Sequence, residues 1–97
     1  MLNTVTFSSR VVAATTVFAT AKPQDLTRSF LMVQNKGTVD VYLSFEDTPV
    51  AETSIRIPAG AFFEPFSIPS NKLSVATASG TADVLVVTSS AYTKTNS

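Results

Sequence analysis

The sequence predicts an all-β fold, either a small β-sandwich or a small barrel. Roughly six or seven short segments are rich in β-branched and aromatic residues, turn-forming residues separate them about every eight to twelve residues, and no segment has a helical period. A chain of 97 residues makes one domain. A domain of this size buries a smaller fraction of its surface than a larger domain does, so docking or oligomerisation would add to its stability.

Composition excludes several classes of partner. The chain carries seven basic and seven acidic residues, its net charge is zero, and the basic residues are scattered singly. A nucleic acid or an anionic membrane surface needs a cluster of positive charge, so we expect neither as a partner. Charged residues make up only 14% of the chain against 44% apolar residues, which indicates that part of the surface is normally covered.

Residues 1–21 allow two interpretations. Arg10 precedes an apolar segment, and Ala19–Ala21 has the small-x-small pattern that a signal peptidase cleaves. The basic charge comes late, however, and Thr15 and Thr16 interrupt the apolar segment, which disfavours a signal peptide. We therefore expect residues 1–21 to form an extended N-terminal arm or additional strands. No run approaches the ~20 apolar residues that a membrane-spanning helix needs.

Residues 28–45 are expected to form a β-hairpin. β-branched and aromatic residues fill both arms, and Asn35–Gly37 supplies a tight polar turn between them. The second arm alternates between apolar and polar residues from Val39 to Phe45, as a strand with one buried face does. The first arm is instead apolar throughout Phe30–Val33, which predicts a cover on both faces. We expect the second cover to come from the N-terminal arm or from a neighbouring molecule.

The rest of the domain continues in short strands. Residues 54–58 and 61–66 are expected to be strands that prolines end or place at a sheet edge, and a polar loop over residues 46–53 precedes them. Residues 72–77 and 82–88 are expected to form a second hairpin, with its turn at the four residues between them.

The sandwich domain is therefore expected at residues 22–90, with a polar C-terminal tail at residues 91–97. Consecutive aromatics in a strand point to opposite faces, so one member of the Phe62–Phe63 pair must face outward. The period-2 pattern assigns the following residues to the core: Val33, Val39, Val41, Leu43, Phe45, Ile55, Ile57, Phe63, Leu73, Val75, Val84 and Val86.

The chain offers little chemistry for a reaction. It contains neither His nor Cys, so it has no ordinary catalytic triad, no imidazole base and no common transition-metal site. Glu46, Asp47 and Glu52 share one loop, but their spacing matches no calcium-binding pattern. Glu52 and Glu64 would act as a glycosidase pair only if the fold brought them together beside a cleft. We therefore expect no enzyme, no metal and no cofactor.

Four segments resemble the pattern of small β-sandwich virion proteins of tailed bacteriophages. The segments are Arg28–Gly37, Val41–Phe45, Ile55–Gly60 with a Glu shortly after it, and Leu73–Gly80. They correspond to a strand that ends in Q-N-x-G, a V-Y-x-x-F strand, an I-x-I segment with a Pro and Gly turn, and a last hairpin with a small-Ser-Gly turn. The segment Ala59–Phe63 carries more aromatic bulk than the pattern.

The resemblance implies a capsid decoration or cement protein. Such a protein is a single small jelly-roll-like β-sandwich with an extended N-terminal arm, made in the host cytoplasm and placed on the surface of the capsid. The implied partners are the major capsid protein and further copies of this chain, as a homo-oligomer on the capsid lattice. A head-tail or tail accessory protein is the alternative position in the virion.

A cement protein needs exposed contacts instead of a catalytic group. We expect these contacts on the N-terminal arm, which could add strands to an exposed sheet edge, and on nearby aromatic side chains. The candidate interface residues are Val11, Val12, Val17, Phe18, Phe62, Phe63 and Phe66. For any one of Phe62, Phe63 and Phe66, an ordinary core position is the favoured interpretation. A carbohydrate-binding module is the competing interpretation, but the chain has no Trp and only two Tyr to form a binding platform.

Overall fold

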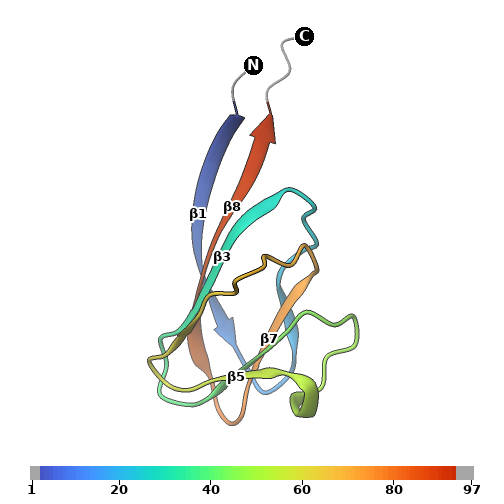
Figure 1. Cartoon of the computed structure of the whole chain (residues 1–97). Helices are drawn as coiled ribbons and strands as arrows, with labels where there is room; N and C mark the ends of the chain where they lie inside the picture. Colours follow the sequence, from blue (N-terminus) through green and yellow to red (C-terminus); the bar gives the residue numbers. More distant parts are fainter. Residues whose placement is uncertain (1–2, 94–97) are drawn as a thin grey trace.

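The computed structural model describes residues 3–93 of the chain (Figure 1). The elements are β1 (Asn3–Ala14), β2 (Ala19–Lys22), β3 (Arg28–Asn35), β4 (Val41–Ser44), the 3-10 helix η1 (Ala51–Thr53), β5 (Ile55–Ile57), β6 (Phe62–Phe63), β7 (Leu73–Thr77) and β8 (Ala82–Thr93). Pro58, Pro65 and Pro69 all lie outside the strands, where their missing N–H groups break no ladder. Among the described residues, no helix has the length and apolar character needed to cross a membrane.

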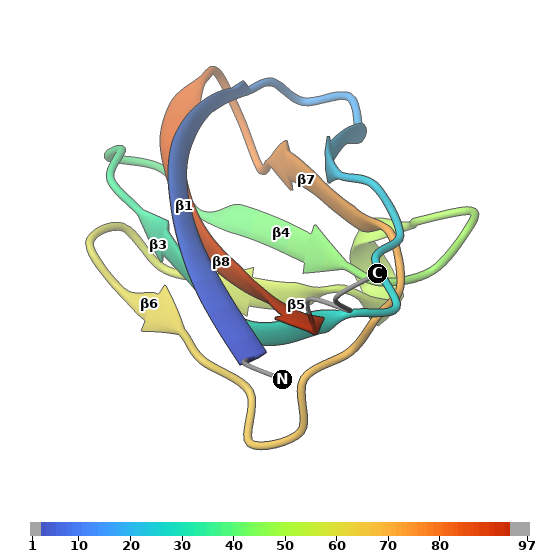
Figure 2. The ribbon, with the colours of Figure 1, turned by 90° about the horizontal axis from the view of Figure 1, so that it is seen from above.

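The strands form two antiparallel four-stranded sheets, with the orders β1-β8-β3-β6 and β2-β7-β4-β5. Figure 2 shows the two layers. Each strand of the first half pairs with its counterpart in the second half: β1 with β8, β2 with β7, β3 with β6, and β4 with β5. This nested pairing is that of one long hairpin rolled into two sheets, which is a jelly roll. The predicted all-β sandwich is therefore confirmed.

The predicted hairpin at residues 28–45 is wrong. Its two arms are β3 and β4, and these lie in different sheets, so the segment between them is an arch across the sandwich. The turn residues are those of a hairpin, but β3 forms its ladders with β6 and β8, and β4 forms its ladders with β5 and β7. Gly37 is needed for close approach, since a Cβ atom at this position would lie 2.5 Å from the Cβ of Ala82.

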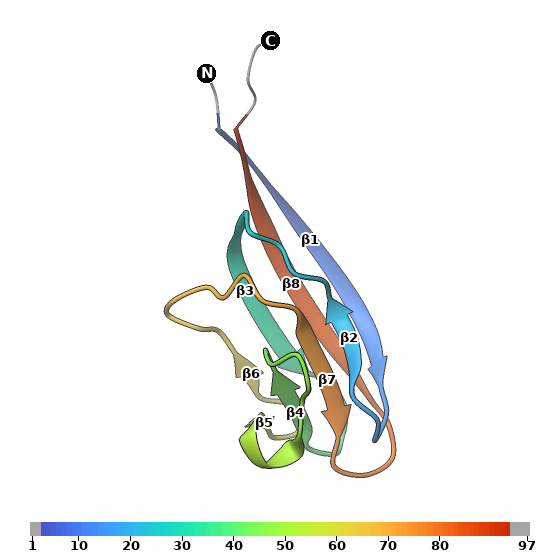
Figure 3. The same ribbon diagram turned by 90° about the vertical axis from the view of Figure 1, so that its right-hand side faces the viewer.

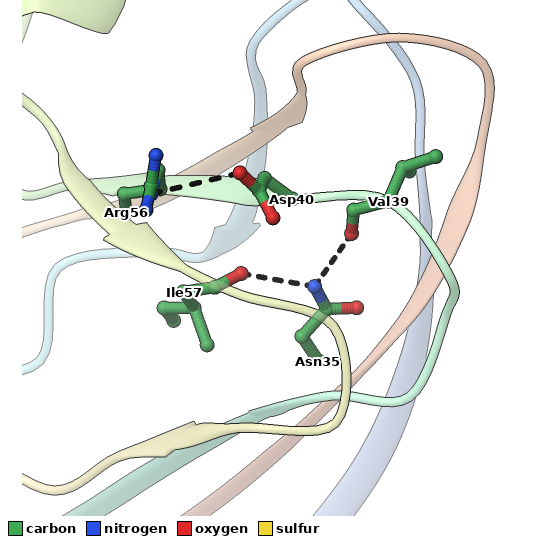
Figure 4. Close-up of polar contacts among 5 residues, drawn as sticks. All are labelled: Asn35, Val39, Asp40, Arg56 and Ile57. Atoms are coloured by element: carbon green, nitrogen blue, oxygen red, sulfur yellow. Dashed lines mark hydrogen bonds and ion pairs between the residues drawn. The ribbon is translucent and has the colours of Figure 1, made fainter.

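Asn35 is fully buried and bonds to three segments of the chain (Figure 4). Its Nδ2 donates to the carbonyl oxygens of Val39 at 2.7 Å and Ile57 at 2.9 Å, and its Oδ1 accepts from the N–H of Gly37 at 2.9 Å. Its main chain also bonds to the β5–β6 turn, because the Asn35 carbonyl accepts from the N–H of Gly60 at 2.9 Å. One amide therefore holds both sheets together at the arch.

The predicted second hairpin is also wrong, for the same reason. β7 pairs with β2 and β4, whereas β8 pairs with β1 and β3, so residues 78–81 form another arch between the sheets. Gly80 has a φ of +63°, which favours glycine, and its carbonyl accepts from the Thr77 hydroxyl at 2.7 Å. The arches also bond to one another, because the N–H of Ala78 donates to the Asp40 carbonyl at 3.0 Å.

The core lies between the two sheets. All twelve residues predicted for it are either buried or packed against the buried cluster. The pattern missed Leu31, Ala14, Ala21 and Ala82, which are also buried in this cluster. Phe63 points toward the core and packs near Phe45, whereas Phe62 is 63% exposed, so the prediction that one aromatic of this pair faces outward is confirmed.

Residues 3–14 are the strand β1, which pairs with β8 along its whole length, and residues 19–22 are the strand β2. The N-terminal segment therefore supplies additional strands. β1 and β8 extend beyond the other strands at one end, where β1 begins and β8 ends (Figures 1 and 3). Residues 91–93 of the expected polar tail belong to β8, and residues 94–97 lie outside the described range.

Candidate interaction surface

The sheet β1-β8-β3-β6 has one face on the core and one face pointing away from it. Strand register places ten residues of the second face in three cross-strand rows. The rows are Phe7, Ser89 and Phe30; Ser9, Val87 and Met32; and Val11, Leu85, Gln34 and Phe62. We call these ten residues the outer sheet face.

The outer sheet face is largely apolar and none of its ten residues is charged, although the next row on the same side of the sheet, Ala13 and Asp83, brings one exposed carboxylate. Seven of its ten residues are apolar, and the other three are two serines and a glutamine. Phe7 and Phe62 are each 63% exposed and Val11 is 54% exposed. Most of the remaining members are half-buried. A contiguous uncharged patch of this kind is typical of a surface that binds another protein.

Phe7 and Phe30 meet edge to face across the central strand of this sheet. Their ring centroids are 5.7 Å apart and the ring planes are inclined by 77°. Ser89 lies between them in the register and is only 2% exposed, because the two rings close over it. Its hydroxyl is 2.9 Å from the hydroxyl of Ser29.

This geometry corrects the expected cover of Phe30–Val33. Leu31 and Val33 face the core, whereas Phe30 and Met32 are half-buried on the outer sheet face. The N-terminal segment lies in the same sheet and contributes only Phe7 beside Phe30, so it does not form a layer over this face. A neighbouring molecule as the cover stays a prediction.

The opposite surface of the sandwich differs in character. On the outer side of the sheet β2-β7-β4-β5, Ser74 and Ala76 are small and buried between their neighbours. Arg56 and Asp40 form an exposed ion pair there, with Nε and Oδ2 3.5 Å apart (Figure 4). An exposed pair of this kind contributes little to stability and keeps the surface hydrated. The exposed large apolar side chains that the structure describes within strands, Phe7, Val11 and Phe62, all belong to the first sheet.

A loop beside β6 extends the apolar surface. Phe66 is fully exposed in the connection between β6 and β7, which swings away from the body of the molecule (Figure 2). With Phe62, Pro65 and Ile68 it lines a shallow, open recess that also includes Phe63 and the polar residues Ser29 and Glu64. An exposed aromatic beside a recess is a typical anchor in a protein interface.

The predicted interface residues fall into two groups. Four of them are exposed: Val11 and Phe62 on the outer sheet face, Phe66 in the adjacent loop, and Val17 in the β1–β2 connection. The remaining three are less accessible, since Val12 and Phe63 pack against the core and Phe18 is half-buried.

The second feature of this sheet is the free edge of β1. β1 stands at the end of the strand order and pairs only with β8, so about half of its backbone N–H and C=O groups point away from the sheet. We call this side the β1 edge. It is twelve residues long, whereas the other edge strands β2, β5 and β6 have four, three and two residues.

A polar cluster lies where β3 begins. Arg28 is only 8% exposed, and its guanidinium donates to the carbonyl oxygens of Pro69 at 2.8 Å, Asn71 at 3.0 Å and Pro23 at 2.9 Å. Burial lowers the pKa of Arg28, and the negative charge of Asp25 opposes this shift. Arg28 therefore ties two loops to the sheet.

Asp25 belongs to the same cluster. Its Oδ2 accepts a hydrogen bond from the Ser90 hydroxyl at 2.6 Å, and its Oδ1 accepts from the hydroxyl and N–H of Thr27 at 2.7 and 2.9 Å. These bonds, with that from Ser90 as the largest cause, lower the pKa of Asp25 to about 2. An aspartate that stays ionised and bonded in this way is a structural group and a poor proton donor at neutral pH.

The acidic loop shows no metal-binding arrangement. Glu46 accepts a hydrogen bond from the Thr53 hydroxyl at 2.7 Å and thereby closes the β4–β5 loop. Within residues 3–93, no group of three or more His, Cys, Asp or Glu side chains is placed to hold a metal ion.

Among known proteins, a solved structure shares the fold of this chain. No protein-family model matches the chain, and no curated protein matches it. It is similar to a solved structure of a Bacillus endospore appendage, described as one of a family of disulfide-linked pili. The TM-score is 0.58 at 13% identity, over 96% of this chain and 93% of that chain. Identity this low shows a shared fold alone.

Sequence reasoning missed most of the outer sheet face. Phe7, Phe30, Met32, Leu85 and Val87 were not among the candidate interface residues. The run 30–33 had already indicated a second apolar face, and the run 84–87 is continuously apolar in the same way. What the runs could not reveal is that they lie side by side in one sheet.

Proposed function

We propose that this chain is a non-enzymatic structural protein of a phage virion. It docks its outer sheet face on the capsid surface and stabilises the contacts between capsid subunits. The observation that carries this proposal is the uncharged, apolar sheet face, which the chain itself does not cover within the described residues.

Burial of the exposed apolar side chains would drive the docking. Taking a large apolar side chain out of water contributes about 1.5–3 kcal/mol. Phe7, Val11 and Phe62 expose more than half of their surface, so a complementary protein surface would gain from covering them. Part of this gain offsets the cost of association. A capsid lattice repeats the same surface many times. Such a lattice suits a small protein whose docking at one site contributes only a modest binding free energy.

The capsid as the partner is supported by the motif resemblance. Asn35 and Gly37 of the Q-N-x-G motif form the arch between the sheets, and Gly60 turns with a φ of +81°. These motif residues therefore maintain the fold, and the docking contacts come from other positions. A decoration protein of this kind is made in the host cytoplasm and then joins the capsid surface. A head-tail or tail accessory position is the alternative within the virion.

The test uses two charge substitutions on the outer sheet face. Met32→Lys with Phe62→Glu places charges on this face, leaves the net charge unchanged, and avoids β1. Thr20→Glu, on the exposed part of β2 in the other sheet, is the matched control. Binding to purified heads that lack the chain is measured by co-sedimentation, with circular dichroism to verify folding.

We expect saturable binding of the wild type and of the control, and loss of binding by the double variant. Equal binding by a folded double variant would exclude the outer sheet face. Deleting the first twenty residues is not a suitable test, because it removes β1 and part of β2 and so removes strands from both sheets.

A second candidate, a subunit of a protein filament, is favoured by the likeness to the endospore appendage structure. Those pili are described as disulfide-linked, whereas this sequence contains no Cys, so disulfides within it could not link its copies. Electron microscopy of the concentrated protein separates the two candidates. Filaments formed without heads would favour the second candidate, and a protein that binds heads without polymerising would favour the first.

A further inference from the structure

We infer that the β1 edge pairs with the β1 edge of a second copy of this chain. The two strands run antiparallel about a two-fold axis at Ser9 and join the two sheets into one. This inference deepens the self-association part of the proposed function by naming the edge and the register.

The first observation is the open ladder. A strand at a sheet edge presents unpaired N–H and C=O groups, and natural proteins usually protect such an edge with Pro, Lys or a short strand. β1 has none of these protections. It is twelve residues long, contains no Pro and no Lys, and carries a single charge at Arg10. Another β-strand is the group whose chemistry matches this row of donors and acceptors.

The second observation is the overhang of β1 and β8. β3 pairs with β8 only as far as Ser90, whereas β1 continues to pair with residues 91–93 of β8. Beyond β3 the sheet is therefore a two-stranded ribbon (Figure 3). Such a ribbon has marginal stability in water unless a further strand or layer supports it.

The register follows from the side chains of β1. An antiparallel pair centred on Ser9 places Phe7 opposite Val11 of the second copy, so apolar residues of the outer sheet face meet each other. It also places Arg10 opposite Ser8 of the second copy. A pair centred on Arg10 would instead oppose two guanidinium groups, which destabilises a cross-strand pair.

The same register supports the overhang. It sets Val5 opposite Ala13 of the second copy, and Thr4 opposite Ala14 of the second copy. Ala13 and Ala14 belong to the end of β1 that joins the body of the sandwich, where Ala14 is buried in the core. Each overhang therefore lies beside the body of the other copy, and the ribbon gains a third strand.

The assembly has a functional consequence. The dimer is closed, because each copy uses its β1 edge on the other, and it forms one eight-stranded sheet. In this register, odd-numbered residues of β1 lie opposite odd-numbered residues of the second copy. Side chains that oppose each other point to the same side of a sheet, so the outer sheet faces of both copies lie on the same side. Two docking faces on one rigid body would bind a repeating surface with avidity.

Single cysteines test the register directly, because the natural sequence has none. In the proposed pair, the two Ser9 residues are directly opposed, with Cα atoms about 4.5–5.5 Å apart, which a disulfide spans. The two Ser8 residues are diagonal neighbours at about 7–8 Å, beyond the reach of a disulfide. Both serines are exposed on β1, so Ser8→Cys is the matched control for Ser9→Cys.

We expect mild oxidation to convert Ser9→Cys into a covalent dimer and to leave Ser8→Cys monomeric on a non-reducing gel. Equal cross-linking of the two variants, or none in either, would overturn the register. Sedimentation of the wild type should show a reversible dimer, and a wild type that remains monomeric would overturn the pairing itself.

A charge swap gives an independent readout. Ser8→Lys places a second positive charge opposite Arg10 at two symmetric positions, so the dimerisation constant should weaken by about twofold to thirtyfold. Adding Arg10→Glu to this variant should restore dimerisation. Thr20→Lys on β2 is the control and should leave the dimer unchanged. Failure of the double variant to recover would contradict the register.

These outcomes are separable from those for docking. The docking substitutions lie on β3 and β6, and the dimer substitutions lie on β1. A loss of head binding by a variant that still dimerises supports docking alone, and a dimer that never binds heads supports the β1 pairing alone.

Discussion

The side-chain amide of Asn35 donates to the main-chain carbonyl oxygen of Ile57 at 2.9 Å, from one sheet of the sandwich to the other. This buried bond connects the two sheets at the arch, while β3 and β4 form their ladders with other strands. The same amide also bonds within the arch, to Val39 and Gly37.

We predict that Asn35→Ala destabilises the fold by about 3 kcal/mol, because buried groups of Val39, Ile57 and Gly37 lose their partner. Urea denaturation measures this change in the free energy of unfolding. Asn71→Ala, at an exposed position, is the control and should change the free energy by no more than about 0.5 kcal/mol. An effect of Asn35→Ala as small as that of the control would contradict the role of the amide.

Gly37→Ala should destabilise the protein by about 1–3 kcal/mol through overpacking. The new Cβ would lie 2.5 Å from the Cβ and 2.9 Å from the Cα of Ala82. Combining it with Ala82→Gly removes the closer contact, so the double variant should be more stable than the sum of the two single effects. A double-mutant cycle by thermal denaturation measures this coupling, and strict additivity would exclude the contact as the cause.

Arg28→Lys should cost about 2 kcal/mol, although it keeps the positive charge. The planar guanidinium reaches the carbonyl oxygens of Pro69, Asn71 and Pro23 at once, and a single ammonium group cannot. Chemical denaturation of this variant is compared with that of Arg56→Lys, whose side chain is exposed. Equal stability of the two variants would show that charge alone suffices at Arg28.

Acid should weaken the fold through Asp25. Folding lowers the pKa of this carboxyl from 3.8 to about 2, so its contribution to stability is complete above the higher value and is lost as the pH falls toward the lower one. Asp25→Asn should remove this part of the pH dependence. Tm is measured from pH about 5 to about 2, a range that spans both pKa values. Asp83→Asn, at an exposed site, is the control. An unchanged slope in Asp25→Asn would refute the assignment.

The fold class and most of the core could be predicted because both depend on local alternation. Val41 and Leu43 of β4 alternate with polar neighbours, and this period holds whichever strand they pair with. The pairing could not be predicted in the same way. Turn residues such as Asn35 and Gly80 suit both a hairpin and an arch, and the choice between the two depends on which distant strands the flanking segments pair with.

The candidate surface was predictable only in part. Exposure of Val11 and Phe62 is consistent with their prediction as interface residues. The outer sheet face as a whole depends on β8 lying between β1 and β3, which brings Phe7 and Phe30 together from positions far apart in the chain. Such a long-range arrangement follows from the nested strand pairing and leaves no local pattern in the sequence.

The central claim is that this chain covers a capsid through many identical contacts. Its most direct test is the copy number of the chain in purified virions, measured by quantitative mass spectrometry against the major capsid protein. The account predicts a copy number comparable to that of the major capsid protein, with the chain released from heads when its outer sheet face carries Met32→Lys and Phe62→Glu. A handful of copies per particle, or none, would contradict it.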